Sequence, residues 1–125
     1  MNAWAIHRTE YLALTLVLIG AAIVKRDELG WAYWFFLAAP DLFGLVPAMF
    51  FGKAPARGYL PPRAVWLYNL WHTLTVPIVI AVAVALLFTM VGSPWPLLGW
   101  FTHISVDRLL GFGLRGEDGG QTISR

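Results

Sequence analysis

Four long apolar stretches, each bounded by charged residues or by glycine and proline, constrain this chain more than any other feature of its sequence. They cover residues 4–24, 31–51, 64–91 and 95–114. A helix needs roughly 20 apolar residues to cross a bilayer, so each stretch can supply one transmembrane helix. The sequence therefore predicts an all-α fold, namely a polytopic membrane protein with a four-transmembrane-helix bundle. We expect residues 1–125 to form one integral-membrane domain that ends in a polar tail at 115–125.

The composition agrees with a membrane protein and excludes several kinds of site. Hydrophobic residues make up 58% of the 125 residues and charged residues only 13%, whereas soluble domains carry about 25% charged residues. The absence of cysteine excludes disulfides and thiolate metal sites. The positive residues form no basic block, so we expect no nucleic-acid partner. Expected partners are membrane lipids and either a larger membrane-protein complex or further copies of the chain.

The distribution of lysine and arginine predicts the orientation in the membrane. With four spans, the N-terminus, the loop at 52–63 and the tail lie on one side. The opposite loop carries Lys25 and Arg26, followed by Asp27 and Glu28. Positive residues are retained in the cytoplasm, so both termini of this multi-pass protein should face the cytoplasmic side of the inner membrane. The positive residues of that side are Arg8, Lys53, Arg57, Arg63, Arg115 and Arg125.

Proline and glycine predict irregularities within these helices. Pro40, Pro47 and Pro77 each remove a backbone donor, and the segment between the first two should be the most strongly kinked. The turn at 92–94 is so short that the third and fourth helices should form an antiparallel hairpin. Gly111 and Gly113 should let the fourth helix pack closely or end.

Polar side chains interrupt three of the apolar stretches at a common depth. A charged group at bilayer depth costs at least about 2.5–3.5 kcal/mol, so each one needs a partner or an aqueous cavity. A rise of ~1.5 Å per residue along helices of alternating direction places these groups about 8–17 Å from the cytoplasmic ends. We therefore expect one cluster in the cytoplasmic half of the membrane. Its candidate members are Asp41, Tyr68, Asn69, His72, His103, Asp107 and Arg108.

Helical spacing supports a shared cluster. Asn69 and His72 are three residues apart, and His103 and Asp107 are four apart, so each pair lies on one helical face. The side chain of Arg108 points about 100° away from that of Asp107 around the helix, so it could reach another helix or the cytoplasmic lipid headgroups.

Three interpretations of the cluster follow from its residue types. In the first, Asp41, His72, His103 and Asp107 bind a divalent metal such as zinc, iron or manganese. In the second, a polar lock joins the helices: Asp41 pairs with Arg108, His103 pairs with Asp107, and Asn69 bonds a backbone carbonyl. In the third, His72 is the axial ligand of a haem or pigment.

These interpretations leave two classes of function open. The chain is either a metal- or ligand-binding membrane protein or a non-catalytic accessory subunit that contacts lipid, pigment or a larger complex. The sequence does not decide whether it is an enzyme.

The runs WAYWFFL..PD, LYNLWH...VP and WFTHISVDRLLGFGL resemble those of an uncharacterised bacterial family of small four-helix integral-membrane proteins. The shared motifs are Pro-Asp, Tyr-Asn-x-x-His and His-x-x-x-Asp-Arg-x-x-Gly-x-Gly-Leu, over about residues 31–114. The resemblance implies a fold and a set of site residues but no activity. These residues are Pro40, Asp41, Tyr68, Asn69, His72, His103, Asp107, Arg108, Gly111, Gly113 and Leu114.

Overall fold

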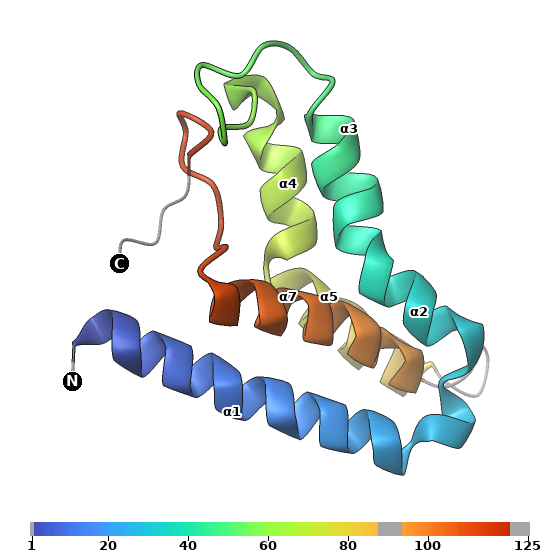
Figure 1. Cartoon of the computed structure of the whole chain (residues 1–125). Helices are drawn as coiled ribbons and strands as arrows, with labels where there is room; N and C mark the ends of the chain where they lie inside the picture. Colours follow the sequence, from blue (N-terminus) through green and yellow to red (C-terminus); the bar gives the residue numbers. More distant parts are fainter. Residues whose placement is uncertain (1, 88–93, 121–125) are drawn as a thin grey trace.

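The computed structural model describes residues 2–87 and 94–120, and within them the chain is helical without a β-strand (Figure 1). This confirms the all-α prediction. The longer helices are α1 (Ala3–Val24), α2 (Gly30–Ala39), α4 (Val65–His72), α5 (Thr75–Leu86) and α7 (Leu98–Leu110). The shorter ones are η1 (Arg26–Glu28), η2 (Pro40–Leu45), α3 (Val46–Ala48), η3 (Pro62–Ala64) and η4 (Trp95–Leu97).

Helix α1 is apolar, and the shorter helix α7 packs antiparallel against it (Figure 1). The first turn of α1 is capped by Asn2, whose side-chain oxygen accepts a hydrogen bond of 2.8 Å from the Ala5 N–H. Thr15 and Ser105 join the two helices through a hydroxyl–hydroxyl hydrogen bond of 2.6 Å. Only 11% of the most apolar 18-residue window of α1 is buried. The remaining apolar surface of this helix therefore faces outward.

The predicted second helix, 31–51, is made of α2, η2 and α3, and its irregular turn lies between the two prolines. Pro40 and Pro47 lack an N–H, so the regular hydrogen-bond ladder cannot continue through them. The chain adopts a π-helical turn between them, and the Val46 N–H bonds the Asp41 carbonyl five residues back. This turn carries Asp41.

The predicted third helix, 64–91, is broken, which corrects the expectation of one continuous helix. Helix α4 ends at His72, Thr73 is extended with φ −91° and ψ 143°, and α5 begins at Thr75. The two parts are bent by 42°. Pro77 cannot donate to the Thr73 carbonyl, which explains a break at this point. Residues 88–91 of the prediction, and all but the last residue of the turn at 92–94, lie outside the described residues.

The predicted fourth helix, 95–114, ends earlier, at Leu110. Gly111 has φ +100°, and the Phe112 N–H bonds the Asp107 carbonyl at 2.7 Å, which terminates the helix in a Schellman-type arrangement. The following residues are not a free polar tail. The Leu60 N–H donates to the Gly119 carbonyl at 3.0 Å, so the segment 111–120 docks on the loop before α4.

The arrangement in space differs from four parallel spans. Helices α3 and α4 lie side by side and stand at an angle to the α1–α7 pair (Figure 1). Of the described helices, α1 alone is long and apolar enough to cross a membrane, and the bent pair 62–72 and 75–86 passes the same test as one broken span. A bundle of four spans is therefore not confirmed.

Gly99 allows α7 to approach α2 more closely than any residue with a side chain would. A Cβ atom at this position would overlap the Tyr33 carbonyl oxygen and would lie 2.8 Å from the Leu37 nitrogen. His103 lies one helical turn farther along the same face, and its Nδ1 contacts the Leu37 carbonyl at 2.7 Å. The close approach at Gly99 thus places a cluster residue against α2.

We expect Gly99→Ala to lower the free energy of unfolding by about 1–3 kcal/mol, because the added methyl group meets backbone that cannot move aside. Gly20→Ala is the matched control, since a Cβ at Gly20 meets nothing within 4 Å in the same kind of helix. This control should raise stability by about 0.5–1 kcal/mol. Thermal unfolding of the two variants measures both effects, and equal melting temperatures would contradict the close packing.

Candidate metal centre

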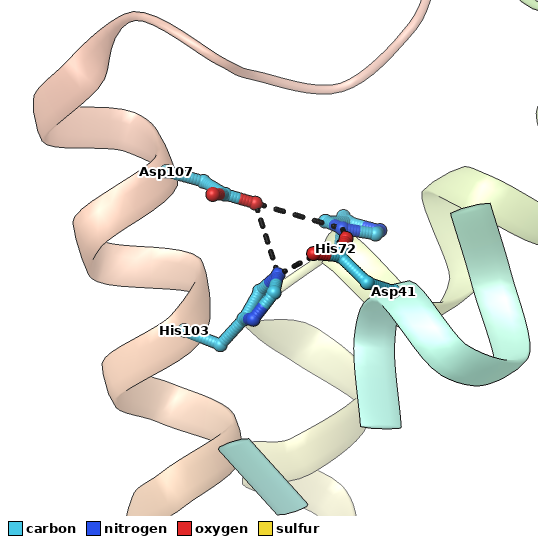
Figure 2. A group of neighbouring side chains, drawn as sticks. All are labelled: Asp41, His72, His103 and Asp107. Atoms are coloured by element: carbon cyan, nitrogen blue, oxygen red, sulfur yellow. Dashed lines mark hydrogen bonds and ion pairs between the residues drawn. The ribbon is translucent and has the colours of Figure 1, made fainter. Parts of the chain in front are cut away.

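Four ionisable side chains from three helical segments converge where η2, the end of α4 and α7 meet (Figure 2). Asp41 comes from η2, His72 is the last residue of α4, and His103 and Asp107 are one turn apart on α7. One ligand atom of each lies within 4.8 Å of one from every other. The structure thus brings together the four residues that the sequence singles out as metal ligands, and they are close enough to hold one ion.

Imidazole nitrogens and carboxylate oxygens alternate around the centre. Asp41 Oδ1 lies 3.2 Å from His72 Nε2 and 3.3 Å from His103 Nε2. Asp107 Oδ2 lies 3.1 Å from His103 Nε2 and 3.6 Å from His72 Nε2. Each oxygen therefore faces both nitrogens, and each nitrogen faces both oxygens (Figure 2).

The hydrogen bonds of the other ring nitrogens fix the tautomers. His72 Nδ1 lies 2.9 Å from the Tyr68 carbonyl oxygen, and His103 Nδ1 lies 2.7 Å from that of Leu37. A carbonyl oxygen only accepts, so both Nδ1 atoms carry the hydrogen. In a neutral imidazole, Nε2 then presents its lone pair to the centre. This is the arrangement in which histidine binds metals, with its other nitrogen held by a carbonyl.

His72 Nε2 forms a hydrogen bond of 3.2 Å with Asp41 Oδ1, and the position of His103 Nε2 is different. This atom is buried, and within the part of the chain that the structure describes it has no hydrogen-bond partner of acceptable geometry. It nevertheless lies within 3.3 Å of carboxylate oxygens from both Asp41 and Asp107. Lone pairs and anionic oxygens that converge on one point are stabilised by a cation between them.

Burial differs among the four side chains. The exposed fractions are 3% for His72, 12% for His103, 22% for Asp107 and 49% for Asp41. The two carboxylates carry a charge of −2, and charge of this kind in an apolar environment needs compensation. A divalent cation supplies it in full while leaving both imidazoles neutral.

Tyr68 and Arg115 support His72 from outside the centre. The Tyr68 ring is buried and stacks on the His72 ring with centroids 3.9 Å apart, and the Arg115 guanidinium lies 5.1 Å from the Tyr68 ring centroid. Arg115 also donates to the carbonyls of Gly58 and Gly119 at 2.8 and 3.0 Å. The C-terminal segment is thereby connected to a cluster residue through stacked side chains.

Asn69 lies apart from the centre and holds the same C-terminal segment. Its Nδ2 donates to the Arg115 carbonyl at 2.9 Å, and its Oδ1 accepts from the Arg115 N–H at 2.7 Å. The predicted bond from Asn69 to a backbone carbonyl is therefore confirmed, whereas its predicted place in the polar cluster is wrong.

Arg108 also has a different role from the predicted one. Its guanidinium donates to the His72 carbonyl at 2.9 Å and to the Tyr11 hydroxyl at 3.3 Å. The predicted pair between Asp41 and Arg108 is thus wrong, because the break after α4 exposes a carbonyl that Arg108 reaches first. The predicted pair between His103 and Asp107 is confirmed at 3.1 Å.

Sequence reasoning missed two contributors. Arg115 appears in the sequence as one charge of a polar tail, and only the fold places it over Tyr68. The second contributor, the Leu37 carbonyl, is a backbone group, so its role cannot be inferred from the residue type. Pro40 predicts an irregular helix near this residue, but not which carbonyl accepts a side-chain hydrogen bond.

A family model described as a domain of unknown function, DUF4260, matches residues 5–123, so the chain belongs to this family. This confirms membership of an uncharacterised family. No curated protein and no solved structure matches the chain.

We expect Asn69→Ala to destabilise the protein by about 1–3 kcal/mol, because two backbone groups of Arg115 lose their partner. Leu70→Ala, at the next and more exposed position, is the control and should change stability by about 0.5 kcal/mol or less. The measurements are thermal unfolding and hydrogen exchange of the Arg115 amide. Unchanged exchange of that amide in Asn69→Ala would contradict the docking of the C-terminal segment.

Proposed function

We propose that this chain, as a member of the DUF4260 family, is a small integral-membrane protein that binds one divalent transition-metal ion through Asp41, His72, His103 and Asp107. One observation carries the proposal. Two histidines, each with Nδ1 bonded to a backbone carbonyl, turn their Nε2 atoms toward the same two carboxylate oxygens.

The nitrogen–oxygen pairs of the centre are spaced closely enough for a small ion, and all four ligand atoms lie within 4.8 Å of one another. Two donors bound at about 2.0–2.1 Å to a tetrahedral ion lie about 3.3–3.4 Å apart. The four nitrogen–oxygen distances around the centre are 3.1, 3.2, 3.3 and 3.6 Å. Two imidazoles with two carboxylates suit zinc, iron(II) or manganese(II), and they offer no thiolate for softer ions.

The outer surface supports a location in the membrane. Large apolar side chains are widely exposed, and Val24, Trp31, Phe50 and Leu86 are the most exposed of them. Soluble monomers rarely expose contiguous apolar surface on this scale, whereas lipid covers it without cost. Together with α1 and the bent pair of helices, this surface supports a location in the membrane. The proposed multi-pass topology with cytoplasmic termini is based on the distribution of lysine and arginine.

A metal-free form of the polar lock, in which the two histidines replace Arg108 as the partners of Asp41, is the alternative. In the lock, protonated imidazoles pair with the carboxylates and no metal is bound, which suits an accessory subunit that contacts lipid or a larger complex through its aromatic outer faces. Metal content therefore separates the two interpretations.

The metal proposal predicts about one ion per chain in protein purified from membranes or reloaded with zinc after chelation. His72→Ala and His103→Ala should each abolish stoichiometric binding, because each removes a nitrogen ligand. His7→Ala is the matched control, since His7 is the remaining histidine and lies outside the cluster. Elemental analysis together with the melting temperature of each variant gives the result.

A metal-free wild type that stays folded would favour the polar lock over the metal centre. Equal loss of metal in His7→Ala would show that the ion binds elsewhere.

The membrane proposal predicts that the loops before α2 and before α4 lie on opposite sides of the bilayer. Because the chain has no cysteine, Asp27→Cys and Ala54→Cys each create a single labelling site. In intact spheroplasts, an impermeant thiol reagent should label Asp27→Cys and spare Ala54→Cys until the cells are lysed. Equal labelling of both, or release of the protein by alkaline carbonate, would contradict the predicted topology.

A further inference from the structure

Asp41 differs from the other three members of the cluster in its exposure and in the backbone that carries it. Its side chain is 49% exposed, whereas Asp107 is 22% exposed and the two histidines are nearly buried. It also lies on the π-helical turn η2, while the other three come from the α-helices α4 and α7. Of the four ligands, Asp41 is thus the most exposed, and the other three are more enclosed.

The three enclosed ligands are held in place by the fold. His72 is fixed by the Tyr68 carbonyl and by stacking on the Tyr68 ring, and His103 is fixed by the Leu37 carbonyl. Asp107 shares one face of α7 with His103. Among the described residues, the carboxylates of Asp41 and Asp107 each pair with the same two histidines, so the two aspartates differ in exposure and in the backbone that carries them.

Two histidines and one carboxylate are by themselves a sufficient set for a metal ion. Catalytic zinc sites use three protein ligands and keep a fourth position for water or substrate, and iron(II) sites with two histidines and one carboxylate keep open positions as well. If Asp41 swings away, a divalent ion bound by His72, His103 and Asp107 retains a charge of +1. An incoming anion with an oxygen donor would restore neutrality.

Resting on the proposed function, we infer that His72, His103 and Asp107 hold the metal ion while Asp41 is an exchangeable fourth ligand. A small oxygen-donor anion, either a carboxylate or a phosphate, binds the metal in place of Asp41. This ligand exchange forms and breaks only metal–oxygen contacts, with no change of oxidation state.

The matched pair Asp41→Asn and Asp107→Asn tests which carboxylate is essential. With cobalt(II) as the probe, Asp41→Asn should still bind about one ion, with an affinity lowered by about 10- to 100-fold, the range seen when a supporting partner of a metal ligand is lost. Asp107→Asn should lose more than about 100-fold. Asp41→Ala, which removes the amide as well, should behave as Asp41→Asn does, and melting temperatures report whether each variant is folded.

The visible spectrum of bound cobalt(II) tests the open position. Acetate or inorganic phosphate, added to the protein in neutral detergent, should shift the spectrum, and should do so at lower concentration in Asp41→Ala than in the wild type. A shift in bilayers that contain phosphatidylglycerol, without added anion, would identify a lipid phosphate as the source of the ligand.

Several results would overturn the inference. Equal loss of cobalt from folded Asp41→Asn and Asp107→Asn would show four obligatory ligands, and a spectrum that no anion shifts would show a closed site. Both would leave the proposed metal binding intact. A wild type that binds no cobalt, zinc or iron would overturn the proposed function and this inference with it.

Discussion

The hydrogen bonds that join the Nδ1 atoms of two imidazole rings to backbone carbonyls are the interaction on which the geometry of the metal centre depends. The anchors at Tyr68 and Leu37 determine which ring nitrogen faces inward, and they bring both Nε2 atoms toward the same two carboxylates. When both rings are neutral, this tautomer presents the Nε2 lone pairs to the two carboxylates. The charge of the carboxylates is then compensated either by a metal ion or by protons on the imidazoles.

Backbone irregularities of the chain position the residues of this centre. The π-helical turn after Pro40 carries Asp41. The break before Pro77 leaves the His72 carbonyl free to accept a hydrogen bond from Arg108. Gly99 lets α7 approach α2 closely enough for His103 to contact the Leu37 carbonyl. Regular helices through the same residues would not place these groups together. Helix distortions of this kind are frequent at functional sites, because they direct side chains that a straight helix would turn away.

Much of the cluster could be predicted from the sequence, because depth and helical phase follow from residue number. His103 and Asp107 share a face of one helix, as their spacing predicts. Four alternating spans predict Asp41 and His72 near them, and the four residues do meet, although the four spans are not confirmed. The partners of Asn69 and Arg108 could not be predicted in the same way. Both bind backbone groups that become available only through tertiary structure, at the C-terminal segment and at the break after α4. The same reason applies to Arg115, whose stacking on Tyr68 depends on the docking of residues 111–120.

X-ray absorption at the metal edge of the loaded wild-type protein tests the central claim most directly, because it reports the atoms around the ion itself. A centre built from Asp41, His72, His103 and Asp107 predicts nitrogen and oxygen donors at about 2.0–2.1 Å, with outer-shell scattering from two imidazole rings. A spectrum with no imidazole scattering, or with an ion surrounded only by water oxygens, would contradict it.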